Sequence, residues 1–139
     1  AAVLAAESRY TEVGRWTEAA LERAPEDAEV WKSVARFYLE RNLDLEEGAL
    51  PAAEGATRLA PTDAEAWMLL GWARLLAQDA RQALAALDTA TRLDDSLARA
   101  HHLRGLAMRA LGREAEARQV LIHAEDLGYR ERLPDAARP

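Results

Sequence analysis

The 139-residue sequence contains no cysteine. Disulfide bonds and thiolate metal sites are therefore excluded, and the redox compartment stays open. Lysine is nearly absent, because Lys32 is the only one and arginine makes up the rest of the 18 basic residues. The net charge is −6, so the chain lacks the basic balance with which nucleic-acid-binding proteins offset phosphate. We therefore expect no nucleic-acid partner.

Long hydrophobic runs and catalytic motifs are also missing. No apolar run approaches the ~18 residues that a membrane span needs, and the first six residues, AAVLAA, lack the basic flank of a secretory signal. Phosphate-loop, zinc-protease and serine-hydrolase motifs are absent. The histidines are His101, His102 and His123, and the adjacent pair point about 100° apart on a helix, so they cannot chelate from one face. We expect no catalytic residue, no metal and no cofactor.

The chain does contain an internal repeat. The segment AWMLLGWARLLAQDARQALAALDTATRLDD (66–95) aligns with AHHLRGLAMRALGREAEARQVLIHAEDLGY (100–129) at an offset of 34 residues. Small and apolar residues match in register, among them Gly71 with Gly105 and Leu87 with Leu121. A third copy starts upstream, where PEDAEVW (25–31) matches PTDAEAW (61–67) at an offset of 36. The two additional residues are predicted to lie in the turn at 41–48.

Each unit contains two helices, because apolar residues recur in steps of three and four and no segment alternates with period two for long. We expect helices at 28–42, 45–59, 64–77, 80–93, 98–111 and 113–127. Asp44, Thr62 and Asp79 are each followed three residues later by Glu or Gln, which predicts helix N-terminal caps. Gly128 is predicted to end the last helix. Pro51 lies inside an expected helix, which it would kink or delay.

A 34-residue helix–turn–helix unit with Trp-x-x-Leu-Gly in its first helix and Ala-x-x-x-Leu-x-x-Ala in its second resembles the tetratricopeptide repeat (TPR). Residues 64–97 carry the pattern best, with Trp67, Leu70, Gly71, Ala83, Leu87 and Ala90. In 98–131, His101 and Arg104 stand at the tryptophan and leucine places. In 28–63, Val34 and Ala35 replace Leu-Gly.

The resemblance implies an all-α fold, a right-handed solenoid of antiparallel helix pairs. It comprises repeats at 28–63, 64–97 and 98–131, followed by a tail at 132–139. Residues 1–24 are either an N-terminal capping helix or the second helix of a degenerate repeat, with Tyr10, Val13, Ala20 and Ala24 on its inner side. The chain begins without methionine, as a piece of a longer protein would.

Gly71 lies in the middle of the helical segment EAWMLLGWARLL, where glycine costs about 1 kcal/mol relative to alanine. The two helices of such a repeat cross closely, and a larger side chain would overpack the crossing at a cost of about 1–3 kcal/mol. We therefore expect three small residues of the first helices to lie opposite alanines of the second helices: Gly71 opposite Ala83, Gly105 opposite Ala117, and Ala35 opposite Ala49.

By the same resemblance, the first helices line a concave groove that binds a peptide. The inward positions would be Lys32, Arg36, Leu39, Glu65, Met68, Trp72, Leu75, Leu76, Arg99, His102, Leu106 and Arg109. The centre would be apolar, around Met68 and Trp72, and both ends would be basic. Such a surface suits a peptide with an apolar anchor and acidic flanks. In the alternative interpretation, Met68 and Trp72 simply pack between repeats, and Lys32 and Arg36 are solvated.

Two functions follow. The first is a non-catalytic binding module for a protein or peptide, acting as an adaptor within a larger assembly. The second is a structural spacer or self-association module, in which Ile122, Tyr129 and Leu133 at the C-terminal end invite a second copy. Binding of chaperone C-terminal tails is not expected, because only Lys32 matches the residues that the family uses for it.

Overall fold

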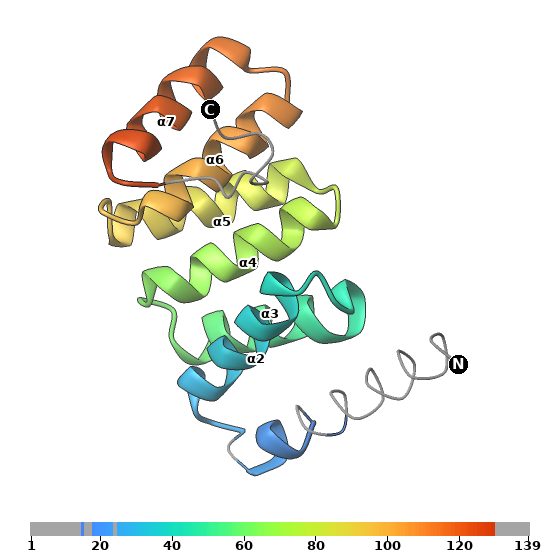
Figure 1. Cartoon of the computed structure of the whole chain (residues 1–139). Helices are drawn as coiled ribbons and strands as arrows, with labels where there is room; N and C mark the ends of the chain where they lie inside the picture. Colours follow the sequence, from blue (N-terminus) through green and yellow to red (C-terminus); the bar gives the residue numbers. More distant parts are fainter. Residues whose placement is uncertain (1–14, 16–17, 24, 130–139) are drawn as a thin grey trace, which may run out of the picture.

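The computed structural model describes residues 15, 18–23 and 25–129 (Figure 1). Six α-helices follow one another: α2 (Ala28–Glu40), α3 (Leu50–Leu59), α4 (Ala64–Leu76), α5 (Ala80–Leu93), α6 (Ala98–Ala110) and α7 (Glu114–Asp126). A π-helical turn, η1 (Leu45–Ala49), leads into α3, and residues 18–23 are also helical. No strand occurs in the described part of the chain. The all-α prediction is confirmed, and five of the six expected helices agree to within two residues; the helix expected at 45–59 is divided into η1 and α3, which begins at Leu50.

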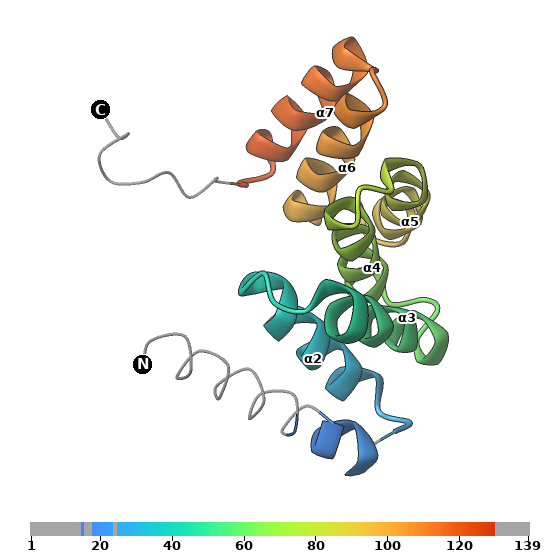
Figure 2. The same ribbon diagram turned by 90° about the vertical axis from the view of Figure 1, so that its right-hand side faces the viewer.

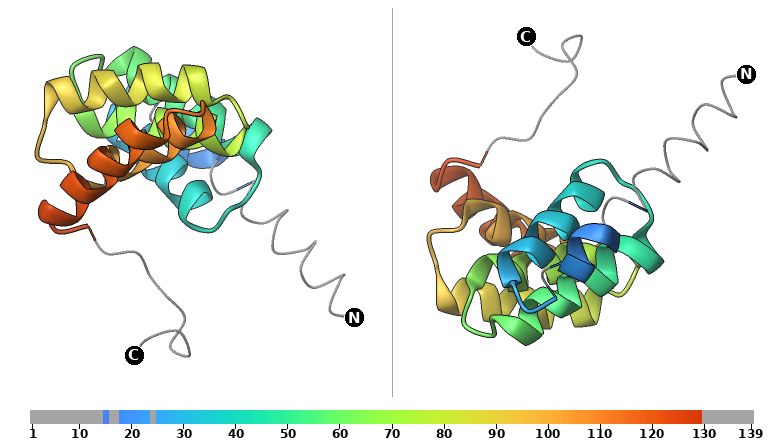
Figure 3. Two further views of the ribbon diagram at one scale, coloured as in Figure 1. Left: turned by 90° about the horizontal axis from the view of Figure 1, so that it is seen from above. Right: turned by 90° about the horizontal axis from the view of Figure 1, so that it is seen from below.

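The helices form three antiparallel pairs, α2–α3, α4–α5 and α6–α7, stacked one above another (Figure 2). Seen along the stack, successive pairs are turned relative to one another (Figure 3). The first helices form a continuous row, because α4 packs against both α2 and α6. The second helices α3, α5 and α7 do not pack against one another to a comparable extent. A stack whose first helices lie closer together than its second helices curves toward the first helices.

Aspartate side chains cap three helices. Asp27 and Asp63 accept 3.0 Å hydrogen bonds from the backbone N–H groups of Glu29 and Glu65 at the starts of α2 and α4. Asp79 accepts a 3.1 Å bond from Gln82 N–H at the start of α5, so its prediction as a cap is confirmed. These bonds satisfy N–H groups that the first helical turn leaves unpaired.

Two other predicted caps are wrong. Thr62 is not the cap of α4, because Asp63 stands one residue nearer to the helix and takes that place. Asp44 precedes η1, but its backbone is left-handed, with φ 31°, and its side chain makes no capping bond.

The first helix of each repeat ends in the same way. Asn42, Gln78 and Gly112 occupy corresponding places and all have positive φ, at 52°, 66° and 82°. Each left-handed residue lets the next N–H group bond back to a carbonyl five residues upstream; Asp79 N–H, for example, reaches Arg74 O at 3.0 Å. Gly128 ends α7 with φ 103°, as predicted. Glycine is thus present at one of the three corresponding turns.

The longer first repeat absorbs its two additional residues where predicted. Leu43 corresponds to Asp79 at an offset of 36, since each donates its N–H to a carbonyl five residues upstream. Glu46 corresponds to Ala80 at an offset of 34. Residues 44 and 45 therefore have no counterparts in the next repeat. They form the left-handed residue before η1 and the first residue of that wider turn. Pro51 then lies in the first turn of α3, so the expected delay of this helix is confirmed.

Gly71 and Gly105 lie where the helices of a pair cross, as expected, but their neighbours differ from the prediction. A Cβ atom on Gly71 would lie 2.4 Å from Leu87 Cγ, and one on Gly105 would lie 2.7 Å from Leu121 Cγ. The leucine of the second helix supplies the nearest atoms in both places, and at Gly105 the predicted neighbour comes next, with Ala117 O 3.4 Å from the added Cβ. Leu87 is fully buried. The small residue therefore makes room for a leucine side chain.

A side-chain hydrogen bond recurs at the start of every repeat. The indole N–H groups of Trp31 and Trp67 donate to Pro25 O and Pro61 O at 2.9 and 2.8 Å. His101 Nε2 lies 2.9 Å from Asp95 O, six residues upstream like the others. The imidazole therefore makes the same bond as the tryptophans.

His101 also contacts His123, whereas His102 stacks on Tyr129. The adjacent histidines point to different partners, as expected.

The terminal predictions are only partly covered. Ala20 and Leu21 are half-buried, and Leu21 packs against the core cluster that contains Tyr38 and Leu69. Tyr10, Val13, Ala24 and Leu133 lie outside the described residues.

Candidate interaction surface

The residues expected to line the groove differ widely in exposure. Lys32, Leu39 and Met68 are buried, at 5, 3 and 8 % exposure. They offer almost no surface to a ligand. The other nine are half-buried or exposed: Arg36, Glu65, Trp72, Leu75, Leu76, Arg99, His102, Leu106 and Arg109. These nine belong to α2, α4 and α6, the row of first helices toward which the stack curves.

The buried amine of Lys32 connects the first two repeats. Its Nζ donates to Asp63 Oδ2 at 2.7 Å and to Glu29 Oε1 at 3.0 Å, and it lies 3.5 Å from Glu65 Oε2. Glu65 is also paired with Arg36. Burial alone lowers the pKa of Lys32, but the bonds to Asp63 and Glu29 outweigh it, so the pKa is raised above 10.5. Lys32 is therefore charged and internally neutralised.

This cluster corrects the expectation of a basic end near α2. The side chains of Lys32 and Arg36 are 6 and 38 % exposed, whereas their partner Glu29 is 73 % exposed. Two cations face three carboxylates, which leaves a surplus of one carboxylate, and the exposed Glu40 and Arg41 at the end of α2 add one charge of each sign. The α2 end of the row is therefore negative. The sequence pattern does not reveal this contact, because Asp63 lies 31 residues from Lys32 and belongs to the repeat motif in its own right.

The contact between α4 and α6 uses different chemistry from the contact between α2 and α4, although the residues stand at corresponding places in the repeats. Trp72 replaces Arg36 at an offset of 36, and Arg99 replaces Glu65 at an offset of 34. The guanidinium carbon of Arg99 lies 5.1 Å from the centroid of the Trp72 ring, within cation–π range. Met68, which replaces Lys32, is buried in a core cluster together with Leu103. The alternative interpretation is therefore right that Met68 packs between repeats, but wrong that Lys32 is solvated, because Lys32 is 5 % exposed.

Around Trp72 lies a partly exposed apolar area. Trp72, Leu75 and Leu76 are spaced by three and four residues, so they share one side of α4. Trp72, Leu75 and Leu106 pack with one face on the same core cluster and remain half-exposed. Arg99 and Arg109 are exposed, and neither has a carboxylate partner within the described ranges. We name this surface the α4–α6 face: Trp72, Leu75, Leu76, Arg99, Leu106 and Arg109.

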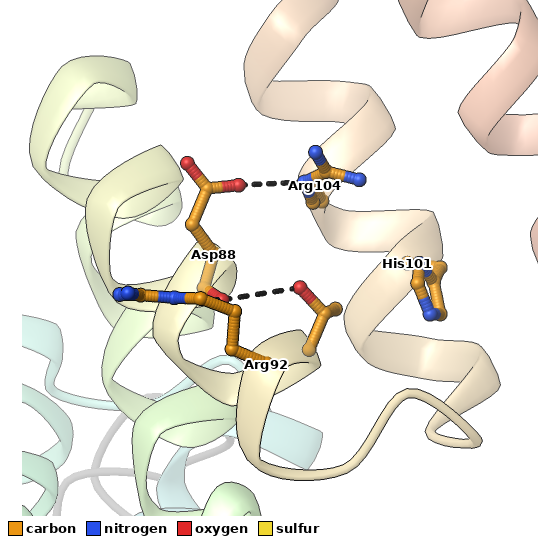
Figure 4. Close-up of a pocket in the computed structure, with 5 residues that line it drawn as sticks. Asp88, Arg92, His101 and Arg104 are labelled. Carbon is orange, nitrogen blue, oxygen red and sulfur yellow. Dashed lines mark hydrogen bonds and ion pairs between the residues drawn. The ribbon is translucent and has the colours of Figure 1, made fainter.

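An open cleft of about 380 Å³ lies between α5 and α6, lined by Asp88, Thr91, Arg92, His101 and Arg104 (Figure 4). Its position follows from two departures from the repeat. His101 stands where the preceding repeat has the larger Trp67, and Arg104 stands where it has Leu70, which is 2 % exposed. Arg104 Nε donates to Asp88 Oδ1 at 2.6 Å. Arg92 folds back along α5, where its Nε donates to Asp88 O at 3.4 Å, and its guanidinium group lies on the other side of Asp88 from Arg104 (Figure 4).

No described helix is both long and apolar enough to cross a membrane. Among the described side chains, no three histidine or carboxylate residues come together as metal ligands would. The candidate site is a surface of apolar and charged groups on α4 and α6.

The geometry defines a class of protein, the α-helical repeat solenoids, in which stacked helix pairs present the inner row of helices as a continuous surface. Within this class the chain has the tetratricopeptide-repeat fold. It matches MamA with a TM-score of 0.72 and 23 % identity, over 82 % of this chain and 66 % of that one. It matches TTC0263, a thermophilic TPR protein of Thermus thermophilus, with a TM-score of 0.70 and 28 % identity, over 91 and 70 % of the two chains.

A third match is the TPR2B domain of yeast Sti1 in its complex with pHsp70, with a TM-score of 0.65 and 23 % identity, over 72 % of this chain and 78 % of that one. No protein-family model matches the chain, and no curated protein matches it in sequence. The chain spans about two thirds of the length of the MamA and TTC0263 chains. The likeness establishes the fold.

Proposed function

We propose that the chain is a non-catalytic protein–protein interaction module that binds a peptide or partner helix on its α4–α6 face, as an adaptor within a larger assembly. TPR domains typically bind proteins, and the TPR2B domain of Sti1 has been solved in complex with pHsp70. The proposal therefore agrees with the use of this fold elsewhere. It does not extend to chaperone tails, because Lys32 is buried against carboxylates of its own chain.

The observation that carries the proposal is the partial exposure of Trp72 beside Arg99. Tryptophan and arginine are the residues most enriched at energetic centres of protein interfaces, because they bury large areas and bond carboxylates well. Trp72 already has one face against the core, so little side-chain entropy remains to be lost when a partner covers the other face. The nearby leucines extend the apolar area along α4.

The test is selection of displayed random 12-residue peptides on the whole 139-residue chain. Selected peptides are expected to bind the wild type and to lose at least about tenfold in affinity on Trp72→Ala, as truncation of an interface centre does. Leu93→Ala is the matched control, because Leu93 is 43 % exposed on α5, in the other row of helices. Circular dichroism checks that both variants stay folded. Peptides whose affinity falls equally in both variants, or no enriched peptide at all, would overturn the proposal.

A second function, self-association through the C-terminal end, is favoured by one observation. Ile122 on α7 is 52 % exposed, more than any other large apolar side chain in the described part of the chain. Sedimentation of the wild type and of Ile122→Glu tests it. A dimer that dissociates in Ile122→Glu but persists in Trp72→Ala supports a self-association module, whereas a strict monomer at high concentration excludes one.

A further inference from the structure

The row of first helices changes sign from one end to the other. At the α2 end, Glu29, Asp63 and Glu65 surround Lys32, and the amine they share is the most buried group of the four. A ligand approaching this end meets the carboxylates and not the lysine. Glu40 and Arg41, both exposed at the end of α2, add one charge of each sign, so the surplus of one carboxylate remains.

At the α6 end the balance is reversed. Arg99 and Arg109 are exposed and have no carboxylate partner among the residues that the structure describes. Arg99 is held over the Trp72 ring, a contact that leaves its N–H groups able to donate to a carboxylate. Between the two ends lies the apolar area of Trp72, Leu75 and Leu76 on α4.

We infer that the partner is a peptide or helix with an apolar anchor and opposite charges on its two sides, basic where it passes α2 and acidic where it passes α6. This inference rests on the proposed function and specifies the partner's chemistry. It replaces the expectation of two acidic flanks, because the α2 end presents carboxylates. Charge complementarity of this kind sets the register of the bound segment and rejects partners of the wrong pattern.

The displayed library of 12-residue peptides also tests this charge pattern. Peptides enriched on the wild type are expected to carry an aromatic or aliphatic anchor with a basic residue on one side and an acidic residue on the other. A synthetic peptide of this pattern should bind about 1.4- to 5-fold more tightly than versions with two acidic or two basic flanks, since each exposed ion pair contributes about 0.2–1 kcal/mol.

Charge-reversal variants assign each flank to one end. Arg99→Glu with Arg109→Glu should shift enrichment toward peptides with two basic flanks, and Glu29→Lys with Glu40→Lys toward two acidic flanks. Arg81→Glu, exposed on α5, is the matched control and should leave the pattern unchanged.

Two failures are distinguishable. Peptides that bind through Trp72 but show no charge pattern, or two acidic flanks on the wild type, would overturn this inference and leave the binding function intact. Peptides whose binding ignores Trp72 would overturn the proposed function itself.

Discussion

Arg99 lies over the ring of Trp72, with 5.1 Å between its guanidinium carbon and the ring centroid, at the place where Arg36 is paired with Glu65 one repeat earlier. The same inter-repeat contact is thus made once by an ion pair and once by a cation–π pair. The two contacts hold equivalent helices together but expose different groups. The difference determines the charge and the apolar character of the row of first helices.

The Arg99–Trp72 contact should contribute measurably to stability. Because the pair is partly exposed, we expect a coupling free energy of about 0.5–1 kcal/mol in a double-mutant cycle of Arg99→Ala and Trp72→Leu, measured by urea unfolding. The matched cycle of Arg81→Ala with Trp72→Leu should give no coupling, since Arg81 is an exposed residue of α5. Equal couplings in the two cycles would contradict the contact.

Gly71→Ala should destabilise the chain more than Gly105→Ala. Alanine gains about 1 kcal/mol of helix propensity at either place. At Gly71 the new Cβ would lie 2.4 Å from Cγ of the fully buried Leu87, and overpacking costs about 1–3 kcal/mol. Leu121 beside Gly105 is partly exposed and can turn aside. Thermal unfolding of the two variants gives the comparison, and a more stable Gly71→Ala would contradict the packing.

Gln78→Gly should stabilise the chain by up to about 1 kcal/mol. Gln78 has φ 66°, a conformation that costs residues other than glycine roughly 1–2 kcal/mol, and Gly112 holds the corresponding place in the next repeat. Gln119→Gly is the matched control within α7, where the same change should destabilise by about 1 kcal/mol. Urea unfolding that shows the same sign for both variants would count against the left-handed turn.

Lys32 should make stability depend on pH in the alkaline range. Its pKa is raised on folding, so its contribution is complete below pH 10.5, the ordinary value, and is lost as the pH rises through the folded-state pKa. The unfolding free energy of the wild type minus that of Lys32→Met should therefore be constant at neutral pH and fall above pH 10.5. If the value for the wild type minus that for the variant stays constant or rises above pH 10.5, the raised pKa is refuted.

Arg104→Leu should be neutral or stabilising although it removes an ion pair. The Asp88–Arg104 pair is partly exposed, and such pairs contribute about 0–1 kcal/mol. Burying a leucine where the preceding repeat has the buried Leu70 contributes about 1.5–3 kcal/mol. Asp88→Asn, which weakens only the pair, serves as the control and should cost less than about 1 kcal/mol. Calorimetry that shows Arg104→Leu to be the less stable of the two would mean that the cleft is not filled.

The helices and their pairing could be predicted because their signals are local and occur three times. Matches such as Gly71 with Gly105 and Leu87 with Leu121 place the small residues at the helix crossings. Their nearest neighbours could not be predicted, because side-chain length decides whether a leucine or an alanine comes closest.

The surface was less predictable for a different reason. Its exposure and charge depend on ion pairs between residues about thirty positions apart, such as Lys32 with Asp63. The repeat alignment contains a signal for one of these pairs, since Arg36 and Glu65 have opposite charges and stand where the next repeat has Trp72 and Arg99.

The wide turn η1 accommodates one of the two additional residues by enlarging a helical turn, and the left-handed Asp44 accommodates the other. By Ala49 the chain has returned to the spacing of the other repeats, and Ala53 and Ala56 are fully buried as in any regular unit. The regular spacing of the repeat is therefore restored within about two helical turns of the insertion. Insertions at this corner are a route by which such an array can diversify one module while every module downstream keeps its fit.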